Sequence, residues 1–211
     1  MKDIIIVGAG GFAREVAWLI EEINLKNQEW NLIGFLDENN NEAKTLNGYR
    51  VLNKSDLVNQ SQAYFVVAIG DSETRKKVVD RYSSFKFATL VHPDVSISTT
   101  NKIGEGSIIC KGNIITVNVD IGKHVIVNID STVGHDAILE DFVTILPSVN
   151  ISGYVRIKEC SNVGTGTQII QEKTIGRNSI IGAGSVVVKD INDYVVAVGI
   201  PAREIKNRRD I

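Results

Sequence analysis

The sequence predicts two domains: a Rossmann-like α/β half domain in residues 1–90, and an all-β left-handed parallel β-helix with a C-terminal tail in residues 91–211. Two observations predict this division. The first part alternates apolar and amphipathic segments around a glycine-rich turn, which is typical of a parallel sheet with crossover helices. The second part places an aliphatic residue at every sixth position, a period that neither a helix nor a simple strand has.

Composition excludes several classes of protein. The 211 residues include 43% apolar and 23% charged residues, with a formal net charge of −2. No basic cluster indicates nucleic acid or anionic lipid as a partner. The apolar run at the N-terminus is too short for a signal peptide and no stretch reaches the length of a membrane span, so we expect no membrane insertion and a cytoplasmic location. Cys110 and Cys160 show neither metal-ligand nor disulfide spacing.

The first 90 residues have a βαβαβ pattern, which predicts a small parallel sheet. The expected strands are Asp3–Val7, Leu32–Leu36 and Tyr64–Ile69, and the expected helices are 12–23 and 72–82. We expect residues 85–91 to link this domain to the coil.

Gly8, Gly10 and Gly11 form the turn between the first strand and the first helix. Such a turn can bring backbone N–H groups to a phosphate at the helix N-terminus. Asp37, at the end of the second strand, can accept hydrogen bonds from a ribose or a base. Ala13 replaces the last glycine of the dinucleotide motif and the half fold is short, so a mononucleotide moiety fits better than NAD. A turn that serves tight packing alone is the open alternative.

The β-helix is predicted by sixteen consecutive aliphatic positions, six residues apart. They are Ile97, Ile103, Ile109, Ile115, Ile121, Val127, Val133, Leu139, Ile145, Ile151, Ile157, Val163, Ile169, Ile175, Ile181 and Val187. A triangular coil with one inward side chain per short strand explains this period. We expect about five coils, stacked at about 4.8 Å, so that residues eighteen apart lie on one edge. Glycines that directly follow the aliphatic residue are expected to make the sharp turns.

Four features carry a resemblance to a known family: the α/β half domain, the hexapeptide repeat, the stretch Gly134-His135-Asp136-Ala137, and the ending Gly199-Ile200-Pro201-Ala202-Arg203. With these features the chain resembles bacterial sugar acetyltransferases of the PglD/NeuD type. The resemblance covers nearly the whole chain. It implies acetyl-CoA along the coil, a nucleotide-linked amino sugar held by the front domain, and a homotrimer with active sites at subunit interfaces.

His135 is the expected catalytic base, because it lies outside the inward row and imidazole accepts protons near neutral pH. Asp136 matches the acidic residue that follows the catalytic histidine in the family; a solvated aspartate is its alternative. Asn128 matches a polar family position near the sugar, although asparagine also suits a left-handed corner. Gly153, one rung from His135, could present its N–H to the thioester carbonyl, or be a simple corner glycine.

The resemblance places Pro201, Ala202 and Arg203 near the CoA nucleotide, and Arg203 and Lys206 could meet its phosphates. We expect Arg208 and Arg209 to be solvated. The chain departs from the family at Thr144 and Phe12, where relatives often carry histidine.

The leading hypothesis is acetyl-CoA-dependent N-acetylation of a nucleotide-linked 4-amino-deoxy sugar in surface glycan synthesis. O-acetylation of a sialic acid and an inactive hexapeptide scaffold are the alternatives. A dehydrogenase is excluded because no second catalytic domain follows the short sheet. We expect no metal site, because His92, His124 and His135 lack ligand spacing, and we interpret His92 and His124 as surface residues.

Overall fold

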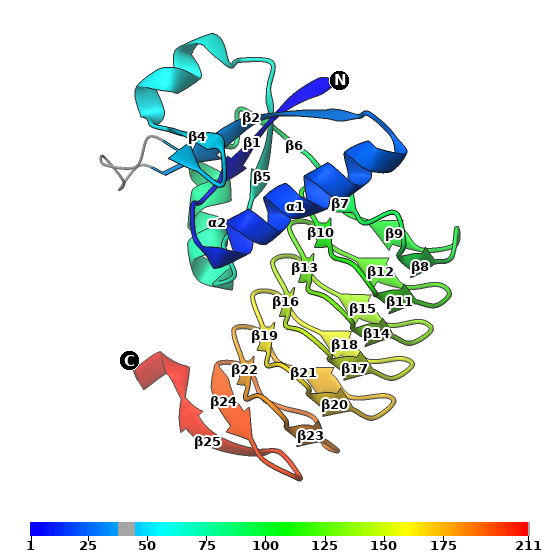
Figure 1. Cartoon of the computed structure of the whole chain (residues 1–211). Helices are drawn as coiled ribbons and strands as arrows, with labels where there is room; N and C mark the ends of the chain where they lie inside the picture. Colours follow the sequence, from blue (N-terminus) through cyan, green and yellow to red (C-terminus); the bar gives the residue numbers. More distant parts are fainter. Residues whose placement is uncertain (38–44, 211) are drawn as a thin grey trace.

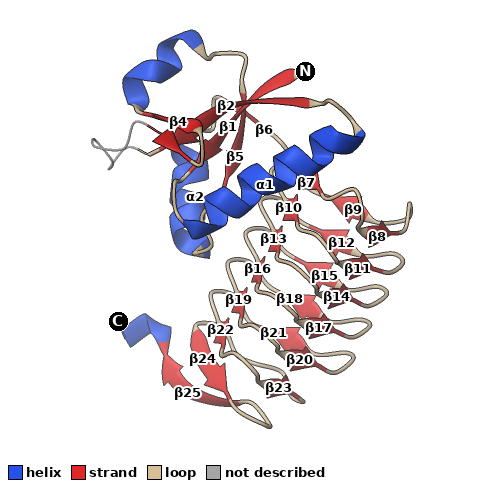
Figure 2. Cartoon of the chain, viewed as in Figure 1, coloured by secondary structure: helices blue, strands red, loops and turns tan. Residues whose placement is uncertain are grey.

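The computed structural model describes residues 1–37 and 45–210 and contains both expected domains. The α/β domain lies against one side of a triangular coil, near the end where the coil begins (Figure 1). The C-terminal hairpin closes the opposite end of the coil (Figure 2).

The α/β domain has one sheet in the order β3-β4-β2-β1-β5-β6. Its strands are β1 (Lys2–Val7), β2 (Trp30–Leu36), β3 (Thr45–Leu46), β4 (Tyr49–Leu52), β5 (Tyr64–Val67) and β6 (Lys86–Phe87). All pair in parallel except β3 with β4. The sequence did not predict β3, β4, β6 or the 3₁₀ helix at Lys54–Asn59, because these short segments lack a clear apolar period.

Helices α1 (Gly11–Lys26) and α2 (Ser72–Arg81) cover opposite faces of this sheet. The buried residues of α1 include Ala13, Val16, Ala17, Ile20 and Ile23. Their three- and four-residue spacing gives one apolar stripe, which packs on Ile4 and Ile6 of β1. The alternate residues of β1 face α2, because successive side chains of a strand point to opposite faces.

The coil has three faces of stacked parallel strands. The first face contains β7 (Leu90–Val91), β10 (Ile108–Ile109), β13 (Ile126–Val127), β16 (Thr144–Ile145), β19 (Asn162–Val163) and β22 (Ile180–Ile181). The second contains β8 (Ser96–Ile97), β11 (Ile114–Ile115), β14 (Thr132–Val133), β17 (Asn150–Ile151), β20 (Gln168–Ile169) and β23 (Val186–Val187). The third contains β9 (Lys102–Ile103), β12 (Asp120–Ile121), β15 (Ile138–Leu139), β18 (Arg156–Ile157) and β21 (Thr174–Ile175).

From β8 onward the second residue of each strand belongs to the predicted aliphatic row, and these side chains form one continuous core, against which Val91 of β7 also packs. The coil has six turns rather than about five, because β7 already pairs with β10 and starts the first turn before Ile97. The predicted boundary between residues 90 and 91 therefore falls within β7. After the sixth turn, β24 (Val195–Val198) and β25 (Arg203–Asn207) form an antiparallel hairpin, followed by a 3₁₀ turn at Arg208–Asp210.

The corners differ from the prediction. The left-handed residue is the third after the inward one, as at Asp136 (φ 57°) and Tyr154 (φ 59°). The glycines that directly follow the inward residue have no positive φ. They are required because adjacent turns approach closely: a Cβ on Gly134 would lie 2.7 Å from the nitrogen of Gly153.

Arg75 of α2 joins the two domains at the first face. Its side chain is 1% exposed. It donates hydrogen bonds to the carbonyl oxygens of His124 and Phe142 in the coil and to that of Ile69 after β5. Burial lowers the pKa of Arg75 to about 10, so the guanidinium remains charged at neutral pH. Since its bonds reach both domains, Arg75 fixes the α/β domain on the coil.

The surface interpretation of His92 and His124 was wrong. Both are buried by the packing of the α/β domain on the coil. His92 Nε2 lies 2.6 Å from a carboxylate oxygen of Glu22 on α1. The His124 ring stacks on Phe142 at 5.2 Å, and burial lowers the pKa of His124 to about 4.

Candidate active site

His135 lies at the corner between the second and third faces, in the turn that joins β14 to β15. Its side chain is 53% exposed, so substrate can reach it. Its Nδ1 lies 2.9 Å from Oδ2 of Asp136. Asp136 occupies the left-handed position of this corner, which aspartate tolerates better than most residues. The carboxylate can thus fix the tautomer that leaves Nε2 free to accept a proton.

Gly153 lies beneath the imidazole, one rung further along the same edge. A Cβ at this position would come within 2.6 Å of both Cε1 and Nε2 of His135. Gly153 is therefore more than a corner glycine, because only a residue without a side chain leaves room for the ring. Within the described part of the chain, its N–H donates no hydrogen bond to a backbone or side-chain acceptor. That N–H is a free donor beside the imidazole.

Tyr154 completes the surroundings of His135, and sequence reasoning missed it. Its ring is perpendicular to the imidazole with the ring centroids 5.1 Å apart, and its N–H donates to the carbonyl oxygen of His135 at 2.9 Å. The signal that could have found it is its position eighteen residues after Asp136, directly adjacent on the same edge.

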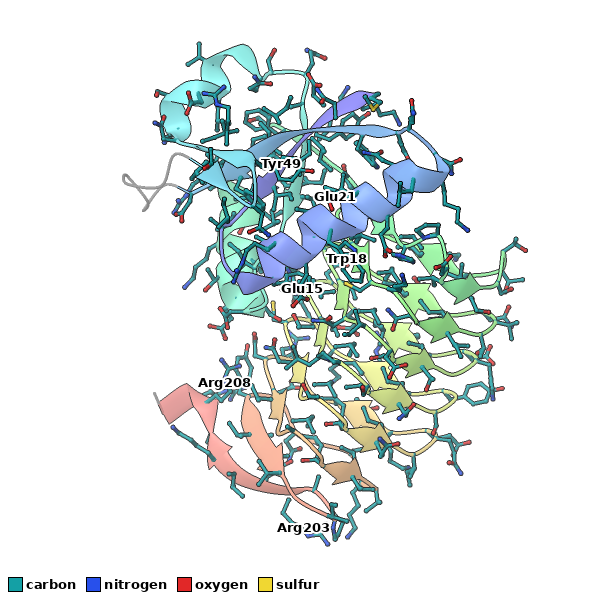
Figure 3. All side chains as sticks on the ribbon, viewed as in Figure 1. Glu15, Trp18, Glu21, Tyr49, Arg203 and Arg208 are labelled. Atoms are coloured by element: carbon teal, nitrogen blue, oxygen red, sulfur yellow. The ribbon has the colours of Figure 1, made fainter. Side chains whose placement is uncertain are left out.

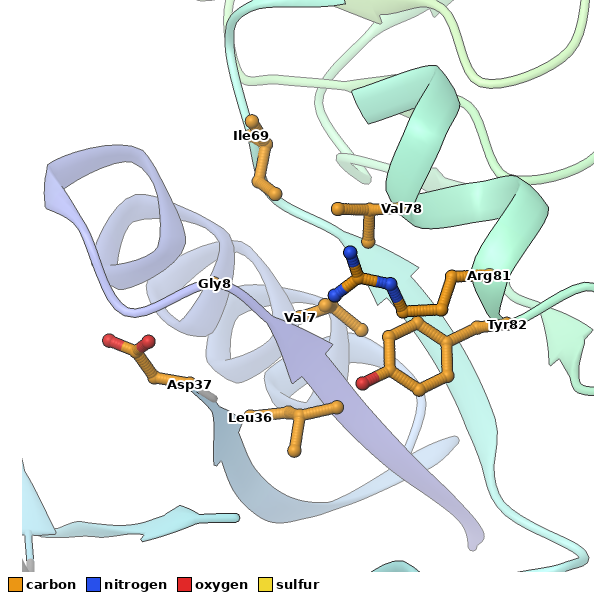
Figure 4. A pocket seen from close by; sticks show the side chains of 8 residues that line it. All are labelled: Val7, Gly8, Leu36, Asp37, Ile69, Val78, Arg81 and Tyr82. Atoms are coloured by element: carbon orange, nitrogen blue, oxygen red, sulfur yellow. The ribbon is translucent and has the colours of Figure 1, made fainter. Parts of the chain in front are cut away.

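A second candidate site lies in the α/β domain, at the carboxyl ends of β1 and β2 (Figure 4). It is a cleft of about 100 Å³ lined by eight residues: Val7, Gly8, Leu36, Asp37, Ile69, Val78, Arg81 and Tyr82. β1 lies between β2 and β5, so the strand order reverses here, and ligands of open parallel sheets bind at such a reversal. The structure thus brings Gly8 and Asp37 together and adds Arg81, a cation that the sequence reading did not single out.

The three glycines of the turn have different roles. Gly8 has φ +109°, a conformation that favours glycine. Gly10 is the N-cap of α1 and Gly11 its first residue, and neither lines the cleft. The first turn of α1 contains no acidic residue and its N-cap has no side-chain hydrogen bond. This helix end keeps a positive potential that suits a phosphate.

Asn128 lies at the corner between the first and second faces, next to β13 and away from the corner of His135. Its Oδ1 accepts a hydrogen bond from the N–H of Ile129 at 2.7 Å. It has no positive φ, so the left-handed explanation for this asparagine was wrong.

The segment after β24 contains both buried and exposed residues. Ala202 is buried in the coil core, and its N–H donates to the carbonyl oxygen of Val186. Pro201 and Arg203 are exposed, and Arg203 lies at the tip of the hairpin, far from α1 (Figure 3). Arg203 and Lys189 line one hollow at this end. Lys189 is three rungs from His135 on the same edge, and the sequence reading missed it.

Of the two basic residues expected to be solvated, Arg209 is exposed, whereas Arg208 is partly buried by its hydrogen bonds to the protein. Arg208 donates to Glu73 of α2 and to the carbonyl oxygen of Asn178, and Arg209 lies 4.5 Å above the ring of Tyr194. Lys206 is exposed on β25.

The family departures lie near the domain interface. Thr144 is buried on the first face, where its hydroxyl donates to the carbonyl oxygen of Gly70 and accepts from Arg75. Phe12, in the first turn of α1, packs against the core of the α/β domain.

His135 and the cleft lie on opposite sides of one protomer. The α/β domain packs on the first face through α1 and α2. His135 lies at the corner opposite that face. One chain therefore does not bring Gly8, Asp37 and His135 to a common site.

In the described ranges 1–37 and 45–210, no helix is long and apolar enough to span a bilayer. In the same ranges, no three His, Cys, Asp or Glu side chains are grouped as they would be around a metal ion.

A left-handed β-helix with a histidine–carboxylate pair at an exposed corner defines the class of hexapeptide-repeat acyltransferases. Comparisons with known proteins agree. Residues 3–82 match the model of the PglD N-terminal domain. GDP-perosamine N-acetyltransferase of Escherichia coli O157:H7 is 32% identical over 95% of both chains. The chain belongs to this PglD-type family of acetyltransferases, and acetyl-CoA is its acetyl donor.

Two solved structures share the whole architecture. The acetyltransferase domain of PglB from Neisseria gonorrhoeae FA1090, in complex with acetyl coenzyme A, is 32% identical with a TM-score of 0.89, over 97% of this chain and 99% of that one. A mutant of perosamine N-acetyltransferase from Caulobacter crescentus, in complex with CoA and GDP-perosamine, is 29% identical with a TM-score of 0.89, over 98% of both chains.

Proposed function

We propose that this protein N-acetylates the amino group of a nucleotide-linked 4-amino-deoxy sugar, with His135 as the general base. The observation that carries the proposal is the His135–Asp136 pair above Gly153, with the imidazole half exposed to solvent. Relatives named for GDP-perosamine N-acetylation support the substrate class. The reaction belongs to surface glycan synthesis in the cytoplasm.

The proposed mechanism is direct attack. The amine nitrogen attacks the thioester carbonyl carbon, and His135 Nε2 takes the amine proton as the C–N bond forms. The Gly153 N–H stabilises the negative charge on the carbonyl oxygen. The C–S bond then breaks, and the imidazolium returns its proton to the CoA thiolate. Asp136 holds the ring in place and stabilises its charged form.

We assign acetyl-CoA to the edge that runs from His135 to the end of the coil. Lys189 is three rungs away, or about 14 Å at the usual strand spacing. That separation suits a thioester at His135 and phosphates near Lys189, Arg203 and Lys206. Pro201 and Ala202 would shape the end of this site, Ala202 through its backbone because its side chain is buried.

We infer that the working enzyme is a homotrimer. Within one protomer His135 lies opposite the face that carries the α/β domain, so a second copy is needed to bring the two sites together. Gly8, Gly10, Gly11 and Asp37 would hold the nucleotide. Asn128 of the same protomer would face the sugar beside His135 of the neighbour. We propose that the α/β domain before β7 binds the nucleotide and that the coil, which begins with β7, carries the transferase site.

The test is a thiol-release assay with acetyl-CoA against GDP-, UDP- and dTDP-linked 4-amino sugars, in parallel with His135→Ala. Turnover of one of these sugars that is lost in the variant supports the proposal. Turnover only with a hydroxyl acceptor such as sialic acid would replace it with O-acetylation. Full activity of His135→Ala would refute the assignment of the base.

A further inference from the structure

Tyr154 is held in a backbone conformation that is unfavourable for its side chain. Its φ is +59°, and left-handed angles are uncommon for bulky residues and better tolerated by asparagine and glycine. The coil demands this conformation at the third position of its corners, so the conformation itself carries no function. The choice of an aromatic side chain at this corner does call for an explanation.

Burial does not explain the tyrosine. Its side chain is 58% exposed, so it contributes little to the core. Within residues 1–37 and 45–210 its hydroxyl makes no hydrogen bond, so no polar contact within the chain retains it. The contact that its ring makes is with the imidazole of His135, perpendicular and 5.1 Å between centroids.

His135 is in turn restrained on three sides. Asp136 binds Nδ1, Gly153 lies under Cε1 and Nε2, and the Tyr154 ring abuts the imidazole. Because the His135 side chain is half exposed, these three contacts are what oppose its rotation into solvent among the interactions of the described residues. Perpendicular aromatic pairs of this kind are favourable beyond the area they bury.

We propose that Tyr154 is a positioning residue, whose ring keeps the His135 imidazole on Asp136 with Nε2 directed at the acceptor. This inference rests on the proposed role of His135 as the base. It predicts that the aromatic ring matters, that the hydroxyl does not, and that the effect passes through His135.

The test compares Tyr154→Asn, Tyr154→Phe and a matched control, Tyr194→Asn. Tyr194 has φ +60° at another corner, so its replacement repeats the same backbone and side-chain change away from His135. Asparagine suits the left-handed conformation, so all variants are expected to fold, as checked by thermal unfolding. With acetyl-CoA and the panel of nucleotide-linked 4-amino sugars, Tyr154→Asn should lower kcat about 10-fold with KM for acetyl-CoA unchanged, whereas Tyr154→Phe and Tyr194→Asn should retain it.

A double-mutant cycle separates positioning from substrate contact. If Tyr154 acts through His135, then Tyr154→Asn has no further effect on the residual rate of His135→Ala. An equal loss in both backgrounds, a loss in Tyr154→Phe, or a wild-type kcat in Tyr154→Asn would each overturn the proposal. If His135→Ala itself retains full activity, His135 is not the base, and both the proposed function of His135 and this inference fail. If only the Tyr154 variants give an unexpected result, the positioning role of Tyr154 fails while the assignment of the base stands.

Discussion

Replacement of Gly153 by alanine tests the proposed base most directly. The new Cβ would lie 2.6 Å from Cε1 and Nε2 of His135, whereas ordinary contacts begin at 3.4 Å, so the ring must move by about 0.8 Å. A displacement of this size would disturb the 2.9 Å contact between Nδ1 and Asp136 and turn Nε2 away from its working position.

The expected result is a large loss of rate with little loss of stability. Displacement of a catalytic group by about 1 Å costs on the order of 100-fold in rate, so kcat should fall about 100-fold. The melting temperature should change by less than about 3 °C, because the half-exposed imidazole can swing aside and Gly153 has no positive φ to strain an alanine.

The assay is thiol release at saturating acetyl-CoA, with thermal unfolding measured on the same samples. Gly182→Ala is the matched control, because its Cβ would meet a side chain, Val198, at a similar 2.7 Å at another corner, away from His135. It should be somewhat destabilised and keep its kcat. A kcat of Gly153→Ala within threefold of wild type would refute the reasoning, because the ring position would then not matter.

Three further outcomes are expected. Asp136→Asn keeps the left-handed corner and should lower kcat about 10- to 100-fold without a change in melting temperature; unchanged kcat would leave Asp136 as a solvated residue. Arg75→Met leaves carbonyl groups of both domains unpaired and should lower the free energy of unfolding, measured in urea, by about 3–5 kcal/mol. The control Lys76→Met removes an exposed ion pair and should lower it by less than about 1 kcal/mol. Equal losses in the two variants would contradict the role of Arg75. The pKa of His124 is lowered from 6.5 to about 4 in the folded protein, so the unfolded chain binds the proton first and the stability of the fold decreases as the pH drops from 6.5 to about 4. His124→Phe should remove on the order of 2 kcal/mol of this decrease. Parallel curves of melting temperature against pH for the variant and the wild type would contradict the prediction.

The coil was predictable because its period is local. An inward aliphatic residue recurs every six positions, so the period can be read from the sequence without knowing any contact of the folded protein. The number of turns was underestimated because Val91 lies in the segment interpreted as a linker. The six-residue period continues back to Val91, and the pairing of β7 with β10 shows that this segment is part of the coil.

The roles of the histidines were only partly predictable. His135 was singled out because it lies outside the inward aliphatic row and matches a family motif. No sequence motif distinguishes His92 and His124, and their burial depends on where α1 and α2 dock on the first face. Docking joins residues far apart in the chain, as Arg75 and Phe142 show, and no local spacing reports it.

The sequence by itself determined the two architectures, the aliphatic core, the phosphate-suited turn and the identity of the His135–Asp136 pair, because each is encoded within a few neighbouring residues. Only the tertiary structure decided that Gly153 and Tyr154 enclose the imidazole, that Arg75 fixes the two domains, and that the cleft lined by Gly8 and Asp37 lies on the opposite side of the protomer from His135. The reason is physical: stacking of coils and docking of domains set distances between residues that the chain separates, and these distances place the reacting groups.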